Sequence, residues 1–182
     1  MVALINMKTR LILAAILLIV AVAIAVGGPP SANENALDHE RAAAVEAMYL
    51  DYQSDFADVP DVTAADLVEW LDDPNTILVD VRKKKEREVS IIAGSITREE
   101  YESNREKYEG YRVVSYCTIG YRSGKYSEQL HSDGVDAWNL AAGILGWVHA
   151  DEPVESESEQ TWRVHVYGRQ WSLLPADYEP VW

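Results

Sequence analysis

Apolar residues recur along the chain in short runs that alternate with helix-like segments. The runs are rich in β-branched residues, which is typical of buried strands. They are "TILVDVR" (76–82), "SIIAGSIT" (90–97), "YRVVSYC" (111–117) and "VDAWNL" (135–140). Segments of about ten residues with helical patterns follow the last three runs, at 98–108, 123–134 and 141–151. This alternation predicts an α/β domain with a central, mostly parallel sheet between layers of helices.

Two further helices are expected before the first of these strands. In the segment 36–56, apolar residues at helical spacing predict an amphipathic helix: Leu37, Ala44, Val45, Met48 and Tyr52. In "DVTAADLVEWLDD", Thr63 is a candidate N-cap because Asp66 follows three residues later, before an apolar face. The polar stretch "KKKERE" (83–88) is expected to be a solvated loop or helical turn.

The N-terminal segment carries the longest apolar run. Lys8 and Arg10 precede uncharged residues from Leu11 to Val26, and Gly-Gly-Pro-Pro follows. The length of the run favours a membrane anchor. The alternatives are a cleaved signal peptide, for which residues 23–25 offer a cleavage site, and a buried core helix. The two cations then keep the N-terminus cytoplasmic, so we expect the body of the chain on the extracytoplasmic (periplasmic or external) side, or secreted after cleavage.

The C-terminal segment is acidic at first and then rich in aromatic residues. After "DEPVESESEQ" come Trp162, Tyr167, Trp171, Tyr178 and Trp182, too much buriable area for a free tail. We expect this extension to dock on the domain, and it is a candidate surface for a protein partner. The predicted organisation is 1–30 anchor or signal with linker, 31–60 helix and connector, 61–152 α/β domain, and 153–182 aromatic extension.

Charge and metal-ligand residues narrow the chemistry. The net charge is −14, which argues against a nucleic-acid partner because phosphate binding needs a basic face. The single cysteine excludes an internal disulfide, and the four histidines lack HxH or HExxH spacing, so no metal or other cofactor is expected. A small anionic substrate remains compatible, provided that one pocket is locally positive.

The stretch "SYCTIGYRSGKYSEQL" places that cysteine where such a pocket can form. Cys117 ends a predicted central strand, and ligand sites in open α/β sheets lie at this end of the strands. Gly120 lets the loop bend, and loop N–H groups together with the next helix N-terminus can bind an anion and favour a thiolate. Arg122 adds donors for an oxyanion. The alternative is a buried structural cysteine.

Two motifs resemble those of rhodanese-like domains over about 63–150. In "DVRKKKEREVSIIAGSI", six positions fall in register with the family: Asp80, Arg82, Glu86, Ile92, Gly94 and Ile96. Four depart from its usual residues: Ser90, Ile91, Ala93 and Ser95. The second motif runs from Tyr116 to Trp147 and covers the cysteine loop, with Ala142-Gly143 where Gly-Gly is usual.

The resemblance implies a three-layer rhodanese-like fold and sulfur transfer. Cys117 would be the catalytic nucleophile, taking sulfur from a small anionic donor such as thiosulfate and passing it to cyanide or a thiol. The loop residues Thr118, Ile119, Gly120, Tyr121, Arg122 and Ser123 would bind the substrate. Asp80 and Arg82 would support the site from outside it; the alternative is a purely structural ion pair, for instance Arg82 with Glu86. For Tyr121, the alternative is an exposed aromatic lip.

Two other functions stay open at this stage. Cysteine-dependent phosphatases carry five residues between cysteine and arginine, whereas four lie between Cys117 and Arg122, a smaller ring that suits sulfur better than phosphate. An arsenate reductase is disfavoured on the same ground. A binding or redox-sensing module that keeps the fold without turnover is the other alternative.

Overall fold

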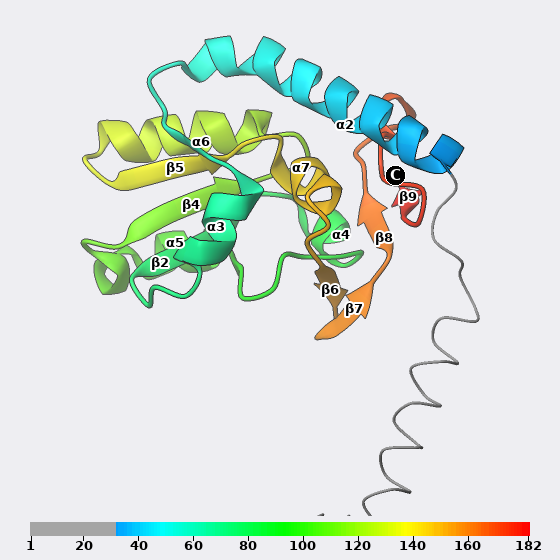
Figure 1. Cartoon of the computed structure of the whole chain (residues 1–182). Coiled ribbons are helices and arrows are strands. Elements are labelled where there is room, and N and C mark those ends of the chain that lie inside the picture. Colours follow the sequence, from blue (N-terminus) through cyan, green and yellow to red (C-terminus); the bar gives the residue numbers. More distant parts are fainter. Residues whose placement is uncertain (1–31) are drawn as a thin grey trace, which may run out of the picture. The chain divides into compact units, whose positions relative to one another are not determined.

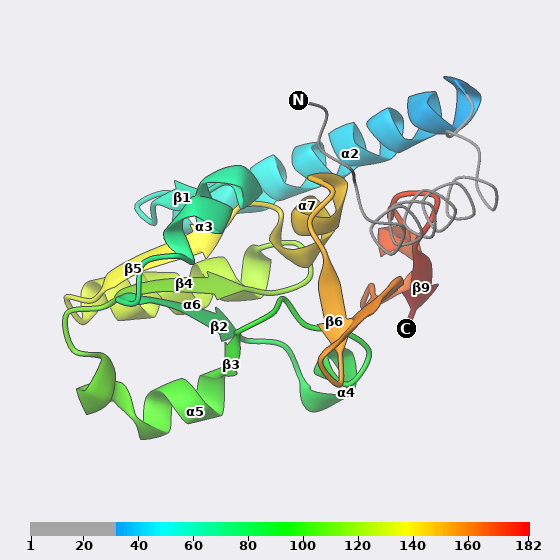
Figure 2. The ribbon, with the colours of Figure 1, turned by 60° about the horizontal axis from the view of Figure 1, so that its bottom comes forward.

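The computed structural model describes residues 32–182 and is built around a five-stranded parallel sheet (Figures 1 and 2). The strand order is β1-β5-β4-β2-β3. The strands are β1 (Asp61–Val62), β2 (Thr76–Asp80), β3 (Ile96–Thr97), β4 (Arg112–Tyr116) and β5 (Asp136–Leu140). β4 is therefore the central strand, and the predicted α/β class with a parallel sheet is confirmed.

Helices cover both faces of the sheet because the strands are apolar on both sides. One face packs against α2 (Ala32–Gln53), α3 (Ala64–Trp70) and α7 (Gly143–His149), and the other against α5 (Arg98–Ser103) and α6 (Tyr121–Ser132). Leu78 and Val114 belong to the first core, whereas their strand neighbours Val79 and Val113 belong to the second. This alternation follows from the two-residue period of a strand.

Local sequence signals explain where several helices begin. The Thr63 side chain accepts a hydrogen bond from the Asp66 N–H at 3.1 Å, so the predicted N-cap of α3 is confirmed. Thr97 and Glu100 form a capping box at the start of α5. The stretch after β2 was expected as a solvated loop or helical turn. It contains the one-turn helix α4 (Lys84–Arg87), but its Glu86 is fully buried, so this part of the stretch is not solvated.

Several element boundaries differ from the expectations. The run 90–97 is mostly irregular: only β3 joins the sheet, and Ile91 forms an isolated bridge with Glu155. The polar helix expected over 98–108 is α5 followed by the 3-10 helix η2 (Arg105–Tyr108), and the first helix ends in η1 (Ser54–Phe56). The acidic stretch after 150 contains a hairpin, β6 (Val154–Ser156) with β7 (Glu159–Thr161).

The aromatic C-terminal segment packs on the domain. It contains β8 (Arg163–His165), η3 (Arg169–Trp171) and β9 (Glu179–Val181), with β8 and β9 paired in parallel. Val164, Val166 and Leu174 are buried in the first core. α2 runs along the same side of the molecule (Figure 1). Its Tyr52 ring stacks on Trp171.

The expected membrane anchor or signal segment, 1–30, lies outside the described residues. Within residues 32–182, no helix combines the length and apolar character that a membrane span requires. The expected anchor and the localisation that depends on it stay predictions.

Candidate functional site

Cys117 lies directly after the last residue of the central strand β4. The loop from Cys117 to Gly120 leads into α6, and Gly120 caps that helix in the left-handed conformation, with a φ of 94°. The Gly120 N–H donates to the Cys117 sulfur at an N–S distance of 3.2 Å. Cys117 is only 1% exposed. The sulfur therefore sits inside a tight loop and accepts a backbone hydrogen bond there.

The start of α7 holds the other side of this loop. The Ile144 N–H donates to the Cys117 carbonyl at 2.9 Å, and the Leu145 N–H donates to the Thr118 carbonyl at 3.2 Å. Gly143 makes this approach possible: it has a φ of 56°, and a Cβ there would lie 2.4 Å from the Cys117 carbonyl oxygen. Ala142, where the family usually has glycine, adopts a φ of 57° in spite of its side chain.

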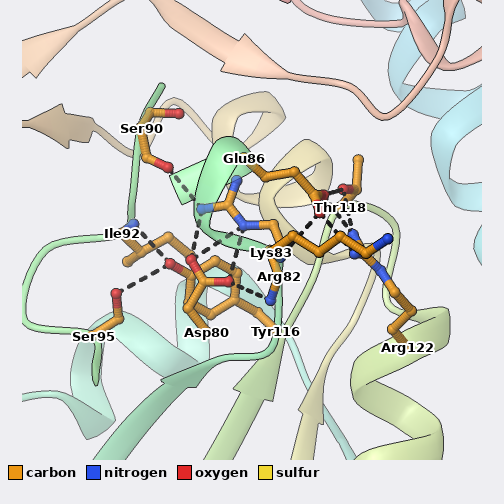
Figure 3. Close-up of polar contacts among 10 residues, drawn as sticks. All are labelled: Asp80, Arg82, Lys83, Glu86, Ser90, Ile92, Ser95, Tyr116, Thr118 and Arg122. Carbon is orange, nitrogen blue, oxygen red and sulfur yellow. Dashed lines mark hydrogen bonds and ion pairs between the residues drawn. The ribbon is translucent and has the colours of Figure 1, made fainter. Parts of the chain in front are cut away.

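Arg122 is anchored by Glu86 of α4 (Figure 3). Its two Nη groups donate to the Glu86 carboxylate at 2.9 and 2.6 Å, and Nη2 also donates to the Thr118 hydroxyl at 3.1 Å. Burial alone would raise the pKa of Glu86, but the hydrogen bonds and charge of Arg122, the Lys83 N–H and the charge of Arg82 lower it to about 2. The loop thus carries a fixed, charge-compensated guanidinium.

Asp80 and Arg82 form a separate buried cluster beside the loop (Figure 3). Arg82 Nη2 donates to Asp80 at 2.6 Å and to the Ser90 carbonyl at 2.7 Å. The Arg82 guanidinium lies 5.3 Å from the centre of the Tyr116 ring, and the Tyr116 hydroxyl accepts from the Ile92 N–H at 3.1 Å. Arg82 is thus paired with Asp80, whereas Glu86, its suggested structural partner, is paired with Arg122. This cluster ties the ends of β2 and β4 to the segment before β3.

A cavity of about 330 Å³ opens at the cysteine loop. It brings together five of the predicted site residues: Cys117, Thr118, Ile119, Tyr121 and Arg122. Gly120 and Ser123 do not line it, and the Ser123 hydroxyl donates to the Gly120 carbonyl at 3.2 Å. Asp80 and Arg82 do not line the cavity.

Sequence reasoning missed the residues that complete the cavity from outside the loop. Tyr52 of α2 and Tyr167 and Trp171 of the C-terminal segment line it. Tyr49, also of α2, packs against the loop at Gly120. Two signals were available, the helical spacing that included Tyr52 and the aromatic richness of the C-terminal segment, but neither pointed to the cysteine.

Within residues 32–182, no cluster of three or more histidine, cysteine, aspartate or glutamate side chains is placed to hold a metal ion. The chain's own groups at the site include a sulfur nucleophile, a backbone N–H and a guanidinium. Those groups suit attack on an electrophilic atom carried by an anion.

The family model described as "Rhodanese-like domain" matches residues 63–150, from the N-cap of α3 to the end of α7. Residues 63–150 are thus similar to rhodanese-like domains. The match includes the whole cysteine loop together with Glu86, Asp80 and Arg82. Tyr49, Tyr52, Tyr167 and Trp171 all fall outside the matched residues.

A curated protein is similar in sequence to part of this chain. The chain is 26% identical over 106 residues to a tRNA uridine(34) hydroxylase of Acholeplasma laidlawii (strain PG-8A); the match covers 53% of this chain and 32% of the relative. The chain thus spans about a third of the length of that relative.

Solved structures include a thiosulfate sulfurtransferase from Pseudomonas aeruginosa, with a TM-score of 0.50 and 22% identity, covering 62% of this chain and 23% of that one. A rhodanese-related protein from Thermoplasma volcanium has a TM-score of 0.46 and 28% identity, covering 54% of this chain and 99% of that one. The predicted α/β rhodanese fold, with an N-terminal helix and a C-terminal extension, is confirmed.

Proposed function

We propose that the protein is a sulfurtransferase that moves sulfane sulfur from a donor to a thiophilic acceptor through a persulfide on Cys117. One observation carries the proposal: the Cys117 sulfur lies in a closed loop, accepts the Gly120 N–H at 3.2 Å and lines a cavity that also contains Arg122. The residue that carries the nucleophile and the residue that carries the cation thus line one cavity, and a backbone N–H holds the nucleophile.

The first half-reaction is attack of the Cys117 thiolate on the outer sulfur of the donor. A new S–S bond forms to Cys117, the S–S bond within the donor breaks, and its electron pair leaves with sulfite when the donor is thiosulfate. The Gly120 N–H, which already donates to the Cys117 sulfur, helps to hold the negative charge in the loop.

The second half-reaction returns the enzyme to its starting state. The acceptor, cyanide or a thiolate, attacks the outer sulfur of the persulfide, and Cys117 leaves as thiolate. When cyanide is the acceptor, the product is thiocyanate. Neither half-reaction requires a metal ion or a redox cofactor.

The loop length supports sulfur over phosphate as the transferred group. Four residues separate Cys117 from Arg122, and the Arg122 fork is held by Glu86. A guanidinium whose two Nη groups already bind a carboxylate has fewer donors to offer a phosphoryl group that carries three oxygens.

The experiment is an assay of thiocyanate formation from thiosulfate and cyanide, and from an organic thiosulfonate and cyanide. The wild-type chain is expected to turn over and the Cys117→Ser variant to be inactive. Hydrolysis of para-nitrophenyl phosphate without thiocyanate formation would establish a phosphatase instead. Absence of both activities across donors would favour a binding or redox-sensing module.

A further inference from the structure

Aromatic side chains surround the mouth of the cysteine cavity. Tyr121 belongs to the rhodanese-like domain, but Tyr52, Tyr167 and Trp171 come from the two flanking segments. The Tyr52 ring lies 5.2 Å from that of Tyr121 and 6.0 Å from that of Trp171, and the Tyr167 ring lies 5.9 Å from that of Trp171, between ring centres. We call these four residues the aromatic rim.

The backbone holds Tyr167 in an unusual conformation at this position. The Gly168 N–H donates to the Val166 carbonyl at 2.8 Å, which closes a three-residue turn. Tyr167 is the central residue of this turn and has a φ of 67°. The Tyr167 N–H also donates to His165 Nδ1 at 3.1 Å. A bulky residue with positive φ is costly and persists only where its surroundings impose it.

Tyr167 is nevertheless 55% exposed, so burial of its ring does not account for this conformation. The turn instead brings the ring over the loop, with the Arg122 guanidinium 5.4 Å from the ring centre. The C-terminal segment therefore presents an aromatic surface to whatever enters the cavity.

The charge and the size of the cavity also indicate a substrate that is larger than a small inorganic anion and partly apolar. Glu86 compensates the charge of Arg122, and Tyr167 covers part of the same guanidinium. The cavity volume of about 330 Å³ is roughly ten times the ~30 Å³ that one molecule occupies in liquid water. Thiosulfate has only five heavy atoms, so it would leave most of this space unfilled.

We propose that the physiological sulfur donor carries its sulfane sulfur on an apolar organic group, and that the aromatic rim binds this group. The inference rests on the proposed sulfur transfer and names the donor class. The sulfur end of the donor meets Cys117, and its aryl or alkyl group packs among the four rings. Such contacts supply specificity because burying the donor's apolar group against the rings, away from water, lowers the free energy of binding.

Organic thiosulfonate anions, R–SO₂–S⁻, provide the matched probes. The Cys117 thiolate attacks the terminal sulfur, the S–S bond of the donor breaks, and the electron pair leaves with the sulfinate R–SO₂⁻. Methanethiosulfonate and benzenethiosulfonate undergo the same step and have the same charge, but they differ in the apolar group. Rates with a small free thiolate correct for their different intrinsic reactivity.

The measurement is kcat/KM for each probe, with cyanide as acceptor. In the wild-type protein, we expect the corrected ratio of benzenethiosulfonate to methanethiosulfonate to be about tenfold or more. Tyr167→Asn removes one ring and suits the left-handed backbone, and Tyr52→Leu removes a ring from the other segment. Each variant should reduce the ratio to about threefold or less.

Trp162→Asn is the control. Trp162 lies in the same C-terminal segment and is half exposed, but it contacts Tyr178 and does not line the cavity. The donor ratio should keep its wild-type value in this variant. Because a ratio is compared within one protein sample, a partial loss of folded protein affects both donors equally.

The possible failures are distinguishable. A corrected ratio near one in the wild-type protein, or a ratio that Tyr167→Asn and Tyr52→Leu leave unchanged, would overturn the aromatic-rim proposal while sulfur transfer stands. Absence of thiocyanate with thiosulfate and with both thiosulfonates would overturn the proposed function itself.

Discussion

Arg122 and Glu86 form a two-pronged ion pair that joins the cysteine loop to α4. The Nη–Oε distances are 2.9 and 2.6 Å, and the Glu86 side chain is completely buried. A buried carboxylate is stable only when its charge and its lone pairs are matched, and here Arg122, Thr118 and the Lys83 N–H provide the match. The pair therefore fixes the loop and depends on Glu86 remaining ionised.

The first prediction is that acid destabilises the protein through Glu86. Its pKa is about 2 in the folded protein against an ordinary value of 4.5, so its contribution is complete above pH 4.5 and is lost as the pH falls toward 2. The contribution is on the order of 3 kcal/mol of unfolding free energy. Urea unfolding across this range measures it.

Glu86→Gln isolates this contribution from those of the other acidic residues. At neutral pH the variant should be less stable than the wild type, and the difference between the two should shrink as the pH falls below 4.5. A difference that is constant with pH would show that the ionised carboxylate does not stabilise the fold.

The second prediction concerns the close approach of Gly143 to the cysteine loop. In Gly143→Ala, the new Cβ would stand 2.4 Å from the Cys117 carbonyl oxygen, so backbone must move. We expect a loss of about 3 kcal/mol or more in stability, and a marked loss of sulfur transfer. Gly134→Ala is the matched control: its φ is 83°, but no atom lies within 4 Å of the added Cβ.

Gly134→Ala should cost about 1 kcal/mol, the cost of a left-handed alanine, and leave the transfer rate unchanged. Equal destabilisation by the two substitutions would mean that the conformation of Gly143, and not its contact with the loop, sets the cost.

The third prediction separates two contributions of Tyr49 of α2. Its hydroxyl donates to Asp61 and accepts from Asn139 Nδ2 at 2.9 Å, and its ring packs against Gly120. Tyr49→Phe keeps the ring and should cost about 1–2 kcal/mol, because Asp61 and Asn139 lose a partner. Tyr49→Ala should cost about 3–5 kcal/mol and also lower the transfer rate. Equal effects on the rate would show that the ring does not position the loop.

The fourth prediction concerns His165, which accepts the Tyr167 N–H through Nδ1. Burial lowers its pKa below the ordinary value of 6.5. The folded protein therefore binds this proton less readily than the unfolded chain. The free energy of unfolding is thus reduced as the pH falls below about 6.5.

His165→Asn retains an acceptor near the same position but cannot be protonated in this range. The pH dependence of its urea midpoint between pH 5 and 7 should be weaker than that of the wild type. An unchanged profile would assign the dependence to another group.

The parallel sheet and the cysteine loop were predictable because both depend on local sequence. Short apolar runs indicate buried strands whatever their partners, and the spacing of Cys117, Gly120 and Arg122 lies within six residues. The Thr63 cap was predictable for the same reason. The irregular path through 90–95 was not, because its apolar residues pack without joining the sheet beyond the bridge at Ile91.

The rest of the site depends on contacts between residues far apart in the sequence. Tyr52 and Trp171 lie more than a hundred positions apart and meet only in the folded chain. The pairing of Glu86 with Arg122, and not with Arg82, depends on where α4 lies relative to the loop, which no local pattern encodes. The roles of the site residues stay predictions, and so do the predicted segment boundaries.

The most direct test of the account is the intact mass of the protein after brief incubation with a sulfane-sulfur donor and removal of the excess. We predict a gain of one sulfur atom in the wild-type chain, no gain in Cys117→Ser, and loss of the added sulfur on addition of cyanide. No gain with thiosulfate or with either thiosulfonate, or an equal gain in Cys117→Ser, would contradict the assignment of Cys117 as the sulfur carrier.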